Sequence, residues 1–185
     1  TTRRRSLALA TPHAAATEAG RTAFEDGGTA VDAALAACAT LTVVYPHMCA
    51  LGGDAIALAH APDGTVTSVN GSGAAPAALS AARVRAALER DPAPVTRTGS
   101  LCAAWETLRR LGGVLPLARL LRPAIGFAAD GCPVSRSLAA TLAWEPELLA
   151  ADPGLRAIYF RRRDGATLAP LKQGDVYRQP ALAAS

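Results

Sequence analysis

Aromatic residues are scarce in this chain of 185 residues, at 4% of the sequence, although half of all residues are hydrophobic. Much of the apolar content is therefore alanine and leucine, which favours closely packed helices over disorder. No apolar run reaches the length that crosses a membrane. Basic residues exceed acidic ones by only 19 − 15 = 4 and are scattered, unlike the dense basic face of a nucleic-acid reader. We expect neither a membrane nor a nucleic acid as partner.

Motifs that hold metals or nucleotides are also missing. The four cysteines, Cys38, Cys49, Cys102 and Cys132, do not occur at metal-ligand or C-x-x-C spacing. The chain contains no P-loop, no H-E-x-x-H helix and no G-x-S-x-G turn. We expect no metal and no cofactor. Isolated thiols are typical of a reducing compartment, which favours a cytoplasmic location, with secretion as the alternative if a signal peptide was removed.

Breaker residues divide the chain into helices and one hairpin. Helices are expected at residues 13–25, 30–41, 79–90, 101–111, 117–129 and 135–149. Thr29 should cap the second helix, and Pro146 should kink or end the last one. A short strand is expected at residues 158–160.

Two glycine-rich turns, Gly52-Gly53 and Gly71-Ser72-Gly73, lie on either side of the expected hairpin. Its strands are Ala55–His60 and Thr65–Asn70, joined by Ala61-Pro62-Asp63-Gly64. Glycine lets a backbone approach a ligand or another backbone closely. These turns therefore fit a substrate pocket and tight packing equally well.

The last residues of the sequence have the pattern of a helix start. Pro180 followed by Ala-Leu-Ala-Ala is typical of the first turn of a helix. We therefore expect further polypeptide to belong to the same fold.

Several segments resemble, in order and spacing, the large subunit of the γ-glutamyltranspeptidase family. Residues 26–34 are similar to the family's Gly-Gly-Asn-Ala-Val-Asp-Ala-Ala segment, and residues 43–53 to its Val-Val-Glu-Pro-His-Met-Ser-Gly-Ile-Gly-Gly segment. Further similar landmarks are residues 14–20, Trp105, 131–135, 171–175 and 178–182.

The resemblance implies an α+β fold, the four-layer αββα sandwich of N-terminal-nucleophile hydrolases. Residues 1–185 would form the large-subunit part of a single domain and supply mainly helical layers and part of the sheets. A precursor that cleaves itself would supply the small subunit, giving a heterodimer, with a dimer of heterodimers as the alternative assembly. The small subunit would begin with a threonine, whose hydroxyl attacks the substrate carbonyl while its own amine acts as base. No metal or organic cofactor is implied.

Thr1 is an N-terminal threonine, but we do not assign it as the nucleophile. Arg3-Arg4-Arg5 follows where this fold needs a buried strand, and the landmarks place this end at the start of the large subunit. We therefore expect no catalytic residue in this chain.

The chain departs from the family pattern around the expected pocket. The family commonly reads Asp-x-Arg-Glu-x-Ala-Pro after the hairpin, where the arginine pairs with the α-carboxylate of the γ-glutamyl group. Here Ser72 stands at the arginine position and Gly73 at the glutamate position, after Asn70. Tyr45 replaces a glutamate and Cys49 a serine, and Asp54 replaces a further glycine. We expect Asn70, Ser72, Gly73, Tyr45 and Cys49 to line the substrate pocket, unless another arginine compensates for Ser72.

Three functions remain open. The first is a γ-glutamyltranspeptidase-like hydrolase or acyltransferase retuned to another small-molecule substrate, as in actinobacterial antibiotic-biosynthesis homologues that cleave a C–C bond. The arginine-rich, lysine-poor composition suits an actinobacterial source. The second is an ordinary γ-glutamyl hydrolase or transferase acting on glutathione-like substrates. The third is a non-catalytic scaffold that kept only the fold.

Overall fold

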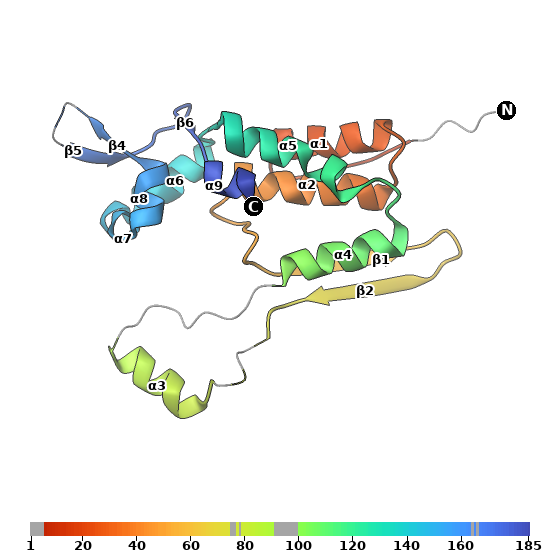
Figure 1. Ribbon diagram of the computed structural model, residues 1–185, viewed down its shortest axis with the longest axis horizontal. Helices are drawn as coiled ribbons and strands as arrows, with labels where there is room; N and C mark the ends of the chain where they lie inside the picture. The colour runs from red at the N-terminus through yellow and green to blue at the C-terminus, as the bar shows by residue number, and fades with distance from the viewer. Residues whose placement is uncertain (1–5, 75–76, 78, 91–99, 164, 166) are drawn as a thin grey trace. The chain divides into compact units, whose positions relative to one another are not determined.

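The computed structural model describes residues 6–74, 77, 79–90, 100–163, 165 and 167–185. Thr1 and the Arg3–Arg5 run lie outside the described residues. The described chain forms two compact units, of which unit 1 comprises Thr1–Ala50 with Gly112–Ser185 and unit 2 comprises Leu51–Leu111. The helices and most of the strands of both units are labelled in Figure 1.

Unit 1 is built on a buried helix, α2 (Ala30–Val44), which packs against α1 (Ala14–Glu25) and α5 (Leu117–Asp130). Small residues permit this packing, because a Cβ on Gly20 would lie only 2.7 Å from the carbonyl oxygen of Ala33. Thr29 and Asp32 form a reciprocal capping box at the start of α2. The abundance of alanine thus explains how three helices pack closely without large side chains.

The remainder of unit 1 consists of short helices and short strands. Its helices are α6 (Arg136–Trp144), α7 (Pro146–Ala151), α8 (Pro153–Tyr159) and α9 (Pro180–Ala184). Its strands are β3 (Cys132–Pro133), β4 (Phe160–Arg163), β5 (Thr167–Pro170) and β6 (Val176–Tyr177). β3 pairs antiparallel with β6, and β4 with β5.

Unit 2 contains a hairpin of β1 (Ala55–His60) and β2 (Val66–Gly71), with α3 (Ala81–Arg90) and α4 (Leu101–Gly112, whose last residue falls in unit 1). The register pairs Ala55 with Gly71 and His60 with Val66. A Cβ on Gly71 would lie 2.5 Å from the Cβ of Ala104, so the glycine allows α4 to pack tightly against the end of the hairpin.

Most sequence-based expectations for the elements are confirmed, including the α+β class, the Thr29 cap, the hairpin and the helix that begins at Pro180. The predicted strand at residues 158–160 is wrong in its first two positions, because α8 runs to Tyr159 and only Phe160 is extended. The helix predicted at residues 135–149 is two helices, since the chain breaks at Glu145 and restarts at Pro146. A single domain completed by a second subunit stays a prediction.

Candidate functional site

The loop that leaves β2 carries three of the predicted pocket residues close together, namely Asn70, Ser72 and Gly73. Two side-chain oxygens hold its backbone. The N–H of Ser72 donates to Asn70 Oδ1 at 3.0 Å, and the N–H of Gly73 donates to Asp54 Oδ1 at 2.8 Å. The first bond closes a local turn of the kind that asparagine favours. The second ties the loop to the residue directly before β1.

The loop offers an uncharged hydrogen-bonding group to a ligand. Ser72 is exposed, and within the described part of the chain its hydroxyl has no hydrogen-bond partner. Residues 70–74 include no arginine or lysine. A serine donates one neutral hydrogen bond, whereas an arginine donates a charged fork that matches a carboxylate. This loop can therefore bind a neutral polar group, but it supplies no cation of its own.

Tyr45 and Cys49, the other two predicted pocket residues, lie in a turn after α2. The carbonyl of Tyr45 accepts from the N–H of Met48 and from that of Cys49, each at 3.1 Å. Burial raises the pKa of the Cys49 thiol. A thiol with a raised pKa is a poor nucleophile at neutral pH, which favours a packing role for Cys49.

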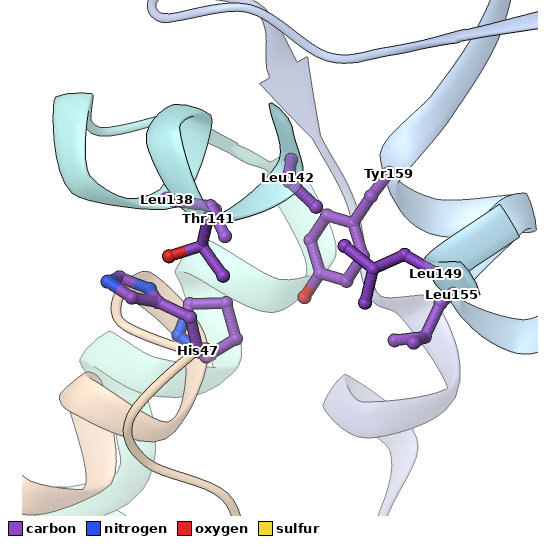
Figure 2. A pocket seen from close by; sticks show the side chains of 8 residues that line it. His47, Leu138, Thr141, Leu142, Leu149, Leu155 and Tyr159 are labelled. Carbon is purple, nitrogen blue, oxygen red and sulfur yellow. The ribbon is translucent and has the colours of Figure 1, made fainter. Parts of the chain in front are cut away.

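A separate pocket in unit 1 was not foreseen from the sequence (Figure 2). Its volume is about 280 Å³, and four of its eight lining residues are leucines. The lining residues are Pro46, His47, Leu138, Thr141, Leu142, Leu149, Leu155 and Tyr159. No sequence signal pointed to it, because the leucines read as ordinary helix faces.

Three polar side chains line this pocket, those of His47, Thr141 and Tyr159. The Tyr159 hydroxyl points into it (Figure 2) and accepts a hydrogen bond from Gln179 Nε2 at 3.1 Å. Both ring nitrogens of His47 are buried and lack a partner among the described residues. Burial lowers the pKa of His47, so its imidazole is neutral at pH 7. The pocket can accommodate a small uncharged apolar group.

The predicted pocket residues fall into two groups. Asn70, Ser72 and Gly73 belong to unit 2, and Tyr45 and Cys49 belong to unit 1. The structure brings the members of each group together, and their joint role in one substrate pocket stays a prediction.

The described residues contain no group of three metal-binding side chains that could hold an ion. Among the helices of the described segments, none combines the length and apolar character needed to span a membrane.

Comparisons of the sequence with known proteins all point to one family. The family model for gamma-glutamyltranspeptidase matches residues 16–185. The oxamate amidohydrolase proenzyme of Klebsiella pneumoniae is 37% identical over 180 residues, which cover 93% of this chain and 33% of that protein. The glutathione hydrolase proenzyme of Escherichia coli is 29% identical over 185 residues, 96% of this chain and 31% of that protein. The chain thus spans about a third of the length of these curated relatives.

A solved structure supports the fold. The crystal structure of Helicobacter pylori gamma-glutamyltranspeptidase superimposes with a TM-score of 0.85 at 25% identity, covering 100% of this chain and 54% of that chain. The predicted N-terminal-nucleophile-hydrolase architecture is confirmed by this similarity.

Proposed function

Because this chain belongs to the γ-glutamyltranspeptidase family, we propose that it is the large-subunit part of a two-subunit enzyme that transfers or hydrolyses an acyl group. The relatives quoted above include an oxamate amidohydrolase and a glutathione hydrolase, both named proenzymes. Their names support a precursor that is cleaved into two chains. The second chain would be the partner of this one.

In this proposal a threonine at the start of the second chain is the nucleophile. Its hydroxyl attacks the substrate carbonyl while its own free amine accepts the proton. Backbone N–H groups hold the oxyanion, and water or an acceptor amine then resolves the acyl-enzyme. The present chain would contribute substrate-binding residues, with Ser72 foremost.

The proposed specificity rests on one observation, the serine at position 72. It occupies the exposed loop position at which the resembled family has an arginine, and the loop supplies no cation from residues 70–74. A lost charge-assisted pair costs about 1.5–3 kcal/mol, or roughly ten- to a hundredfold in affinity. We therefore propose an enzyme that uses γ-glutamyl donors poorly and accepts another acyl group, such as a natural-product intermediate cleaved at an amide or C–C bond.

The second candidate function is an ordinary γ-glutamyl hydrolase, favoured by the similarity to a glutathione hydrolase proenzyme. Steady-state kinetics of the assembled enzyme on a γ-glutamyl anilide separate the two. We expect weak or absent turnover. A kcat/KM of about 10⁴ M⁻¹s⁻¹ or more, ordinary for an enzyme on its own substrate, would instead establish the γ-glutamyl activity.

The subunit arrangement has its own test. Intact-mass analysis and N-terminal sequencing of the purified protein should find a second polypeptide from the same precursor that begins with threonine. A precursor that stays uncleaved and shows no acyl transfer would favour a non-catalytic scaffold.

A further inference from the structure

The pocket of Figure 2 is lined only by residues of unit 1 and is large enough for a small molecule. Its volume is about 280 Å³, whereas an apolar cavity of about 150 Å³ already holds benzene. Leu138 and Leu142 of α6 are buried, and Leu155 of α8 is exposed. Buried side chains therefore form one wall of the pocket, and the wall at Leu155 borders solvent.

One polar group in the pocket has a hydrogen-bonding hydrogen without an acceptor. The oxygen of the Tyr159 hydroxyl accepts from Gln179 Nε2 at 3.1 Å, and Tyr159 is buried. Within the described part of the chain, no acceptor receives the hydrogen of this hydroxyl, which points into the pocket (Figure 2). A buried donor without a partner costs free energy. A bound molecule with an acceptor oxygen would remove that cost.

The pocket carries no charge near neutral pH. Among the described residues that line it, none is an aspartate, a glutamate, a lysine or an arginine. Burial lowers the pKa of His47. Burial, with a smaller contribution from Cys132, raises the pKa of Tyr159 to about 12, so both rings are neutral at pH 7. An ion would lose its hydration here without gaining an ionic partner, and the pocket therefore favours a neutral molecule.

We propose that this pocket is a ligand site, which binds a small, neutral, mainly aliphatic molecule through one carbonyl oxygen that accepts from the Tyr159 hydroxyl. The leucines of α6, α7 and α8 would enclose the aliphatic part, and Tyr159 would fix the position of the carbonyl. The inference goes beyond the proposed acyl transfer and does not depend on it, because it uses only side chains of unit 1 and no group from a second chain.

Three probes of similar size test this assignment in the full-length protein at pH 7. 4-Methylcyclohexanone has the acceptor oxygen, 1-methyl-4-methylidenecyclohexane has a CH₂ group in its place, and 4-methylcyclohexanecarboxylate is an anion. Titrations followed by NMR give the Kd of each. We expect the ketone to bind about two- to tenfold more tightly than the alkene, the effect of one net hydrogen bond, and the carboxylate to bind most weakly. Equal binding of ketone and alkene, a preference for the carboxylate, or no binding of the ketone would overturn the proposal.

Tyr159→Phe tests the hydrogen bond. This variant keeps the ring and removes the hydroxyl, so the ketone should lose its advantage over the alkene, while the Kd of the alkene should change little. The measured quantity is a ratio of two affinities, and a purely structural role of the hydroxyl would leave this ratio unchanged. A preference for the ketone that persists in Tyr159→Phe would contradict the role of Tyr159.

A variant that fills the pocket tests where the probes bind. Leu149 of α7 lines the pocket, so Leu149→Trp should occupy it with the larger side chain and abolish binding of both neutral probes. The matched control is Leu148→Trp on the same helix, because Leu148 is exposed and is not among the lining residues. Both probes should bind this control as they bind the wild type, and thermal unfolding shows whether each variant is folded. Unchanged binding to a folded Leu149→Trp would place the probes elsewhere and overturn the proposal.

Discussion

The carboxylate of Asp32 accepts a hydrogen bond from the backbone N–H of Val114 at 3.0 Å, although the two residues are 82 positions apart. Asp32 is fully buried and also accepts from the N–H of Thr29 at 2.7 Å and from that of Leu115 at 3.3 Å. One carboxylate therefore caps α2 and anchors the segment that leads into α5.

Replacing Asp32 should destabilise the protein strongly. Asp32→Ala would remove the charged acceptor of the part-buried N–H groups of Thr29, Val114 and Leu115. Each hydrogen bond to a charged acceptor contributes about 1.5–3 kcal/mol, so we expect a loss of about 3–5 kcal/mol in the free energy of unfolding. Urea denaturation of the assembled protein measures it. The matched control is Asp152→Ala, which removes an exposed cap that accepts from the N–H of Leu155 at 2.8 Å and should cost only about 1 kcal/mol. Equal losses in the two variants would contradict this role for Asp32.

A second prediction concerns alkaline pH. Burial, with a smaller contribution from Cys132, raises the pKa of Tyr159 to about 12, whereas the pKa of tyrosine in an unfolded chain is about 10. The neutral phenol is favoured in the folded state, so its contribution is fully present below pH 10 and is lost as the pH rises towards 12. We expect the free energy of unfolding to fall by about 2–3 kcal/mol across this window. The contribution of Tyr159 is the difference between the free energies of unfolding of the wild type and Tyr159→Phe, measured as a function of pH. A difference that does not change with pH would refute the prediction.

The sequence predicted elements whose signals are local. Thr29 marked the start of α2 because its cap is made within three residues, and the hairpin followed from the turn at Asp63-Gly64. The predicted end of α2 was three residues too early. Pro46 restricts only the residue before it, so Val43 and Val44 stay helical and Tyr45, with φ −133°, is the C-cap.

Features that depend on distant partners could not be predicted. β3 and β6 have two residues each and pair Cys132 with Tyr177, which no local pattern indicates. The unforeseen pocket combines His47 with leucines from a later helical segment. By contrast, Asn70, Ser72 and Gly73 are near neighbours in the chain, so their grouping was predictable. α8 did have a local signal, since Asp152 before Pro153 is a typical helix start.

Gly71 provides a test of the packing at the end of the hairpin. A Cβ at this position would lie 2.5 Å from the Cβ of Ala104 and 2.8 Å from the carbonyl oxygen of Ala55. Gly71→Ala should therefore cost about 2–4 kcal/mol through strain, measured by denaturation. Gly126→Ala in α5 is the control, because a Cβ there meets nothing within 4 Å and alanine should stabilise the helix by about 0.5–1 kcal/mol. If Gly71→Ala left the free energy of unfolding unchanged, the hairpin and α4 would be able to move apart without loss of stability.

Cys49 should be dispensable for chemistry. Burial raises its pKa, so little reactive thiolate is present at neutral pH. We expect Cys49→Ser to keep kcat on the enzyme's preferred acyl anilide within about threefold of the wild type, the size of a small packing effect. Complete loss of turnover in a variant that still folds and undergoes processing would show that the thiol takes part in the reaction.

The last prediction restores a cation to the loop. The Ser72 hydroxyl is exposed and its backbone N–H is held by Asn70 Oδ1 at 3.0 Å, so a longer side chain can be introduced without disturbing a buried contact. Ser72→Arg should raise kcat/KM for a γ-glutamyl anilide by about ten- to a hundredfold, because a charged fork replaces a neutral donor beside the α-carboxylate. Ser68→Arg, at an exposed position of β2, adds the same charge away from the loop and should have little effect. Equal gains in both variants would indicate general electrostatic attraction, and no gain in Ser72→Arg would show that this loop does not face the α-carboxylate.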